Sequence, residues 1–324
     1  MIRRALEGFL LVIAVIVLNF LIIHLAPGNY VDYLAATTGA GSASQSALLI
    51  RQFGLNQPLQ NQLAYYIWNV LHGNLGYSYA YGLPVTTVIF ANLPATVLLV
   101  STASAISAVI GILLGVASSA RKGGLMDSTT GILALAGYAI PTFWLGQMAL
   151  ILFAFDIPLF PSSGIVTIGA RQTPLQNFLD VTHHLILPAI VLAAYQTALI
   201  VRMTRTKMIE TFRKDFITTA RAKGLTERQI FFRHALPNSI NPVITVIGMN
   251  FGFMMAGAIL TETVFSWPGI GLLLYNSMLA RDYPVVLGIL LLISISVVVA
   301  TLITDILYTY LDPRIRLGKS KSGA

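Results

Sequence analysis

The composition of this 324-residue chain places it in a lipid bilayer. Hydrophobic residues make up 56% of it, charged residues only 10%, and its mean hydropathy is +0.77. Soluble domains carry about a quarter charged residues because their surface faces water, so an ordinary soluble protein is excluded. The chain has no cysteine, which excludes disulfides, thiolate metal sites and a cysteine nucleophile. Its net charge of +8 indicates membrane orientation before it indicates nucleic-acid binding.

Six long uncharged stretches predict six transmembrane helices. A helix needs about 20 apolar residues to cross a hydrocarbon core of about 30 Å. The stretches are 8–26, 95–120, 128–155, 185–201, 243–260 and 285–304. We therefore predict an all-α, polytopic membrane helical bundle. Pro141 predicts a kink in the third helix, and Pro188 lies near the start of the fourth.

The first stretch also resembles a signal peptide, because Arg3 and Arg4 precede it. Its apolar run exceeds the roughly 7 to 15 residues of a typical signal peptide, and Pro27 is poorly placed for cleavage. A retained membrane anchor is the favoured interpretation.

The distribution of cations sets the predicted orientation. Of the 20 Lys and Arg residues, all but Arg51, Arg171 and Arg281 fall on one side of the six-helix arrangement. The positive-inside rule then predicts that both termini, the loop 202–239 and the tail 312–324 are cytoplasmic.

Segment 27–94 is predicted to lie outside the cell and to contain one amphipathic helix. The apolar side chains at helical spacing are Leu59, Leu63, Ile67, Val70 and Leu71. We expect this helix to lie against the bundle or the membrane surface, with contact to an external partner left open. A second outer loop, 264–271, is too apolar for a solvated loop and is expected to fold back onto the bundle.

The cytoplasmic loop 202–239 is predicted to form a helix, a turn and a second helix. Helical character covers 211–223, Gly224 breaks it, Thr226 caps a short helix that begins near Glu227, and Pro237 ends that helix. Its apolar face comprises Ile217, Ala220, Ala222, Ile230, Phe231 and Phe232. Such a face on a protruding loop favours a protein partner, the alternative being a basic loop that touches anionic lipid.

No motif predicts catalysis or metal binding. Gly318-Lys319-Ser320 lacks the glycine of a phosphate loop, because Pro313 occupies that position. His183 and His184, near Asp180, are adjacent and point to different helix faces, so an interfacial helix start explains them better than metal ligation. We expect no catalytic residue, no metal and no cofactor bound by this chain.

Polar and small residues within the apolar stretches favour structural roles. Glu262 and Asp305 lie at the ends of their stretches, which makes them weak candidates for a proton relay. Gly111 with Gly115, and Gly248 with Gly252, provide small faces for close helix packing.

The cytoplasmic loop resembles that of permease subunits in binding-protein-dependent ABC importers. Thr218-Thr219-Ala220-Arg221-Ala222-Lys223-Gly224, followed by Leu236-Pro237, matches the family's loop except that Thr218 replaces its glutamate, Thr219 its first alanine and His234 its isoleucine. Six further segments resemble the dipeptide, oligopeptide and nickel branch in the family's order: 54–59, 73–76, 93–96, 262–269, 280–285 and 311–316.

This resemblance implies a single permease domain over 1–324 with type I ABC importer architecture, in the inner or plasma membrane of a prokaryote. The implied partners are a second homologous permease, two ATPase subunits that use ATP and Mg, an extracytoplasmic solute-binding protein and membrane lipid, but no nucleic acid. The implied ATPase-coupling loop comprises Thr218, Thr219, Ala220, Arg221, Ala222, Lys223, Gly224, Leu225, Leu236 and Pro237. A possible gate or binding-protein contact comprises Phe265, Trp267, Pro268, Gly269, Arg281 and Asp282.

The expected function is transport of short peptides, without an ATPase site in this chain. Nickel chelates, glutathione or another small solute remain alternatives within the same class. An ion-coupled secondary transporter, from a different class, predicts internal repeats and a carboxylate near mid-bilayer, and neither is evident in the sequence.

Overall fold

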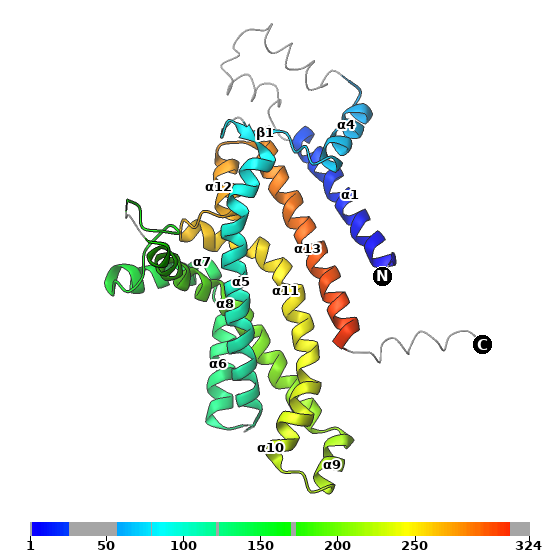
Figure 1. The fold of residues 1–324 in the computed structure, drawn as a ribbon, viewed down its shortest axis with the longest axis vertical. Coiled ribbons are helices and arrows are strands. Elements are labelled where there is room, and N and C mark those ends of the chain that lie inside the picture. The colour runs from blue at the N-terminus through cyan, green and yellow to red at the C-terminus, as the bar shows by residue number, and fades with distance from the viewer. Residues whose placement is uncertain (1, 26–56, 79, 121–122, 170–172, 312–324) are drawn as a thin grey trace, which may run out of the picture. The chain divides into compact units, whose positions relative to one another are not determined.

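A computed structural model describes residues 2–25, 57–78, 80–120, 123–169 and 173–311 (Figure 1). The tail 312–324, most of the outer loop before residue 57 and the side chain of Asp305 lie outside what it describes. The chain divides into two compact units, one formed by Met1–Thr96 with Pro268–Val298 and the other by Val97–Trp267 with Val299–Ala324. Helices α5 (Val85–Ala120) and α13 (Tyr283–Leu311) each begin in the first unit and end in the second.

The first unit joins α1 (Ile2–Leu25) and α4 (Leu59–Leu71) to a short hairpin and to α12 (Ile270–Leu279). Strands β1 (Tyr77–Ser78) and β2 (Leu83–Pro84) pair antiparallel, a small exception to the predicted all-α class. The amphipathic helix at 59–71 is confirmed, and it packs against α1, where the rings of Tyr66 and Phe20 lie 6.0 Å apart. None of its residues is fully buried.

Four helical spans in the described residues are long and apolar enough to cross a membrane: Val85–Ala120, Pro174–Phe212, Glu227–Ala256 and Tyr283–Thr304. A fifth requires counting one bent helix pair as a single span, and α1 contributes a shorter apolar helix, Leu6–Ile22. The multi-pass helical membrane fold is confirmed, while six crossings and the position of the termini remain predictions.

The predicted third helix is broken sharply. Helix α6 (Leu125–Ala139) and the segment formed by α7 (Thr142–Leu150) and η1 (Ile151–Asp156) are bent by 101° relative to each other. Pro141, between them, lacks an amide hydrogen and favours extended backbone at the residue before it, and Ile140 is extended with ψ 125°. The kink at Pro141 is confirmed, but 128–155 is not one straight helix.

Several predicted boundaries were wrong because helices continue past charges and prolines. Helix α5 begins at Val85 and contains Pro94, which we had placed in the outer loop. Helix α8 (Pro174–Phe212) begins at the capping box of Thr173, so His183 and His184 lie inside it and do not mark a helix start.

Pro237 does not end a helix. It lies in the first turn of α11 (Leu236–Val264), where proline is tolerated because the first amides of a helix have no partner in it. The chain is therefore helical without a stop from Glu227 to Val264.

The small residues serve helix packing within the chain. A Cβ on Gly111 would lie 2.6 Å from Ile200 Cγ2, and one on Gly115 2.6 Å from Thr204 Cβ, so these glycines let α5 approach α8 closely. A Cβ on Gly248 would lie 2.6 Å from Thr304 Oγ1 of α13. These contacts support the structural interpretation of Gly111, Gly115 and Gly248.

The apolar loop 264–271 folds back onto helices, as predicted. Phe265 is buried in a cluster with Leu150 of α7 and with Leu187 and Val191 of α8. Trp267 is fully buried, and its backbone N–H donates to the carbonyl oxygen of Glu262 at 2.8 Å.

Candidate functional site

The loop between α8 and α11 forms a compact protrusion at one end of the second unit (Figure 1). It consists of α9 (Asp215–Ala222), α10 (Glu227–Gln229) and η2 (Ile230–Ala235). We call these three elements the docking loop. The predicted helix, turn, helix order is confirmed, although the first helix is interrupted at Arg213 and Lys214.

Gly224 makes the turn between the two helices of the docking loop. Its φ of +77° lies in the left-handed region that favours glycine. The amide of Gly224 donates to Arg221 O at 2.9 Å, and that of Leu225 donates to Ala220 O at 3.3 Å. This pair of bonds is the Schellman arrangement, which satisfies the last carbonyls of α9 and stops the helix.

Polar contacts stabilise the end of the turn where α10 begins. The hydroxyl of Thr226 accepts from the Gln229 amide at 3.3 Å, and the side chain of Gln229 accepts from the Thr226 amide at 2.9 Å, a reciprocal capping box. Arg221 Nε donates to Glu227 Oε1 at 2.8 Å and thereby links α9 to α10.

The Arg221 contact lowers the pKa of the Glu227 carboxyl below its ordinary value, and the same contact raises the pKa of Arg221. A carboxyl whose folded pKa is depressed contributes stability above its unfolded pKa and loses it as pH falls through the folded value. The link is therefore complete at neutral pH and weakens only in acid. Both side chains are solvent-exposed, so its energetic effect is small.

An apolar cluster anchors the docking loop to the ends of the long helices. Met208 of α8 and Ile217, Ala220, Ile230 and Ala235 of the docking loop are all buried together. Further apolar side chains pack around them: Val116, Phe212, Leu225, Phe231 and Leu236. Because this cluster joins α5, α8 and α11 to α9, the docking loop moves with these helix ends and not as a free loop.

The burial pattern corrects the predicted apolar face. Ile217, Ala220 and Ile230, which we expected to meet a partner, are covered by the chain itself. The free surface of α9 and the turn is mainly polar, with Thr218, Thr219, Arg221, Lys223 and Gly224 exposed. Ala222 and Phe232 of the predicted face also remain exposed, as does Phe216 of α9.

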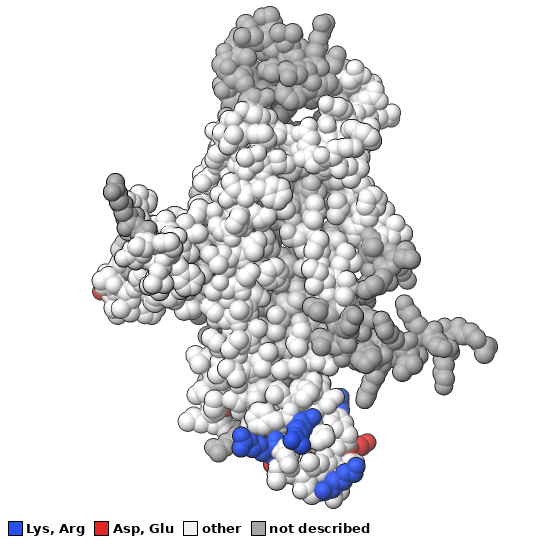
Figure 2. Space-filling view, viewed as in Figure 1, with Lys and Arg blue, Asp and Glu red and all other residues white. Residues whose placement is uncertain are grey.

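Figure 2 shows the Lys and Arg side chains gathered over this end of the molecule. Of the remaining predicted coupling residues, Leu225 and Leu236 are half-buried against the cluster, and Pro237 is exposed.

The predicted gate residues fall into separate structural roles. Phe265 and Trp267 are core residues of their own unit. Asp282 is fully buried and accepts a 2.5 Å hydrogen bond from Ser78 Oγ, which fixes the β1 hairpin. Arg281 is exposed, with a φ of +56°. Pro268 is half-buried and Gly269 is buried.

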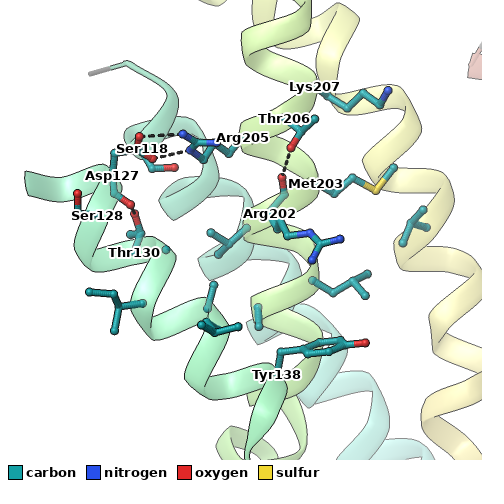
Figure 3. Close-up of a pocket in the computed structure, with 18 residues that line it drawn as sticks. Ser118, Asp127, Ser128, Thr130, Tyr138, Arg202, Met203, Arg205, Thr206 and Lys207 are labelled. Atoms are coloured by element: carbon teal, nitrogen blue, oxygen red, sulfur yellow. Dashed lines mark hydrogen bonds and ion pairs between the residues drawn. The ribbon is translucent and has the colours of Figure 1, made fainter. Parts of the chain in front are cut away.

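The ion pair between Asp127 and Arg205 was not predicted from the sequence. Arg205 of α8 donates from Nε to Asp127 Oδ1 at 2.5 Å and from Nη2 to Oδ2 at 2.8 Å (Figure 3). Asp127 is buried at the start of α6 and also accepts from the Gly123 amide at 2.9 Å. The residues lie 78 positions apart, and no local pattern connects them. The described residues contain no group of three or more His, Cys, Asp or Glu side chains suited to a metal ion.

The chain matches known transport proteins along most of its length. Residues 107–317 match the family model for the binding-protein-dependent transport system inner membrane component. The dipeptide transport system permease protein DppB of Escherichia coli (strain K12) is 40% identical over 321 residues, which cover 94% of each chain. The chain belongs to this family.

Two more relatives and one solved structure agree with this family. The di/tripeptide transport system permease protein DppB of Pseudomonas aeruginosa (strain UCBPP-PA14) is 38% identical, over 93% of this chain and 94% of its own. A putative peptide permease protein of Brucella suis biovar 1 is 36% identical, over 97% and 98%. A chain of the MetNI methionine ABC transporter, solved in inward-facing conformations, shares the fold with a TM-score of 0.56 at 16% identity, covering 69% of this chain and 96% of that one.

As a member of this family, the chain is a permease subunit of an ABC importer. It is the multi-pass membrane component and not itself the ATPase. Its transport cycle therefore involves separate ATPase and solute-binding partners.

Proposed function

We propose that this permease forms half of a pathway for short peptides in the inner membrane of a prokaryote. The observation that carries the substrate class is the 40% identity to a dipeptide permease over 94% of both chains. A second homologous permease supplies the other half, two ATPases bind below, and a solute-binding protein delivers the peptide outside. Both termini are cytoplasmic, and the chain crosses the membrane six times.

We propose further that the docking loop is the surface on which an ATPase subunit sits. Two features support this assignment. The loop is held in place, because its apolar side chains pack against α8 and α11. Its free surface carries Lys223 beside small side chains such as Ala222, a combination that suits close approach of a partner with complementary charge.

Among the predicted gate residues, we distinguish one that can contact the binding protein from two that lie in the core. Arg281 is exposed beside the buried hairpin anchor Asp282, which makes it the member of the group suited to contact the binding protein. We propose that Phe265 and Trp267 act from within the core, by fixing the end of α11.

Transport by the complete importer tests the substrate class. The permease, its partner permease, the ATPases and the binding protein are reconstituted in proteoliposomes. Uptake of a radiolabelled dipeptide should require ATP and the binding protein. If nickel chelates or glutathione accumulate while di- and tripeptides do not, the peptide assignment is wrong and the importer class stands.

Cross-linking tests the docking surface. The chain lacks cysteine, so one cysteine can be introduced at a time. Lys223→Cys, on the exposed side of the turn, should cross-link to an ATPase subunit in the assembled complex. Asn74→Cys, exposed beside the hairpin, is the matched control and should not. Equal cross-linking of both, or of neither, contradicts the assignment.

A further inference from the structure

A cavity of about 940 Å³ lies in the second unit, beside the Asp127–Arg205 ion pair. Figure 3 shows side chains from α6 and α8 around it. One part is apolar, lined by side chains that include Leu135, Tyr138, Ala198 and Leu199. The other part carries cations and hydroxyl groups. This combination is suited to a ligand with one charged end and one apolar end.

The charged end of the cavity holds one cation that no described residue compensates. Arg205 is bound by Asp127 through two hydrogen bonds, and Lys207 Nζ donates to Glu210 at 2.8 Å. The guanidinium of Arg202, about one turn before Arg205 on α8, makes no hydrogen bond or ion pair with any residue that the structure describes. An anionic group entering the cavity would meet these free donors, and Arg is the side chain best shaped to hold a phosphate.

The hydroxyl groups at the cavity wall also differ in whether they have a hydrogen-bond partner among the described residues. Thr130 and Thr206 donate to carbonyl oxygens of their own helices. Ser128, also at the cavity wall, has no side-chain hydrogen bond among the described residues, and it is exposed. The uncommitted polar groups are therefore Arg202 and Ser128.

The position of Arg202 along α8 points to the source of the anion. The uncharged stretch 185–201 ends immediately before it, and from this pattern we infer that its guanidinium lies at the depth of lipid headgroups. Tyr138 lines the apolar end of the cavity, and its ring stacks on that of Tyr195 with centroids 5.2 Å apart. Under the orientation proposed above, this depth belongs to the cytoplasmic leaflet.

We propose that the cavity binds an anionic phospholipid of the cytoplasmic leaflet. The lipid phosphate accepts from Arg202 and Ser128, and an acyl chain lies over Leu135, Tyr138 and Leu199. Basic pockets between transmembrane helices bind anionic headgroups in this manner. This inference rests on the proposed orientation, and it is independent of which solute is transported.

The test uses the complete transporter in nanodiscs with a photoactivatable phosphatidylglycerol probe. Cross-links should map to α6 and α8 around Arg202, and a phosphatidylcholine probe should give far fewer. Arg202→Gln should weaken retention of phosphatidylglycerol about fivefold, the effect of one cation at a membrane surface, and Arg202→Lys should retain part of it. Arg213→Gln is the matched control, because Arg213 is an exposed cation at the end of the same helix and does not line the cavity.

Three outcomes would overturn the proposal. Equal labelling by both lipids would show that charge is not recognised. Displacement of the probe by millimolar inorganic phosphate alone would assign Arg202 to a free anion. Displacement by a saturating dipeptide would assign the cavity to the transport route. Peptide uptake measured in phosphatidylcholine vesicles tests the proposed function separately, because loss of lipid selectivity leaves transport measurable there.

Discussion

Gly224 is the single residue on which the turn of the docking loop depends. Its left-handed backbone costs an ordinary L-residue about 1 to 2 kcal/mol, whereas a Cβ there would meet no atom within 4 Å. The penalty is therefore conformational and not steric. We expect Gly224→Val to reduce ATP-driven transport markedly and Gly224→Asn to be milder, since asparagine tolerates this conformation.

Transport and ATP hydrolysis by the reconstituted importer measure this effect. Gly82→Val is the control, because Gly82 also has a positive φ, at +65°, and open surroundings, but lies in the β1–β2 turn. Equal losses from both valine variants would mean that the backbone of the docking loop has no special role.

Two alanines of α9, two positions apart, allow folding and docking to be tested separately. Ala220 is 5% exposed inside the apolar cluster, whereas Ala222 is exposed. Ala220→Trp should overpack the cluster and cost about 1 to 3 kcal/mol, lowering the yield of folded protein. Ala222→Trp should leave the yield normal and abolish ATPase stimulation by holding the docking surfaces apart.

Protein yield after size-exclusion chromatography and ligand-stimulated ATP hydrolysis distinguish the two effects. Normal transport by Ala222→Trp would place the ATPase contact elsewhere on the loop.

At the scale of elements, the Asp127–Arg205 pair joins the start of α6 to α8. Because Asp127 is largely buried, the charge-assisted bonds are protected from solvent, and we expect Asp127→Asn to destabilise the protein by about 1.5 to 3 kcal/mol. Glu210→Gln breaks the exposed pair with Lys207 and should cost less than about 1 kcal/mol.

Thermal unfolding in detergent compares the two variants. A double variant Asp127→Asn, Arg205→Gln should lose little more than Asp127→Asn alone, because the residues form one interaction. Strict additivity would show that each residue stabilises the protein through other contacts.

Helices whose apolar pattern is continuous were predictable from sequence, and their ends were not. The apolar stretches 95–120, 243–260 and 285–304 all lie within observed helices. Their ends moved because membrane helices continue into water when tertiary packing supports them, as α8 does through Arg202 to Phe212. Pro141 predicted the position of the break in the third stretch, whereas the size of the bend, 101°, was not predicted.

At the scale of the whole molecule, the orientation can be measured with an impermeant thiol reagent. Gln60 is exposed on α4 and Thr218 is exposed on α9. In sealed cells, Gln60→Cys should react and Thr218→Cys should react only after permeabilisation, because the cation distribution places these residues on opposite sides. Labelling of Thr218→Cys in sealed cells would reverse the topology and with it the docking surface.

The sequence predicted which segment forms the docking loop, but not which of its side chains are exposed. Gly224 and Thr226 predicted the turn because a left-handed glycine and a capping threonine act on neighbouring residues of the chain. Which side of α9 is free was not predictable, because it depends on Met208 and Val116, which reach the cluster from other helices. The ion pair of Asp127 with Arg205 and the cavity beside it depend on long-range packing in the same way.

The length of α8 has a mechanical consequence. Its 39 residues form one helix of about 58 Å, and the buried Met208 near its end ties it to the docking loop. Such a rod works as a lever: a tilt of about 5° displaces one end by about 5 Å relative to the other. If an ATPase pulls the docking loop by that distance, as proposed above, the part of α8 that follows Pro188 transmits the tilt to the apolar residues before Arg202.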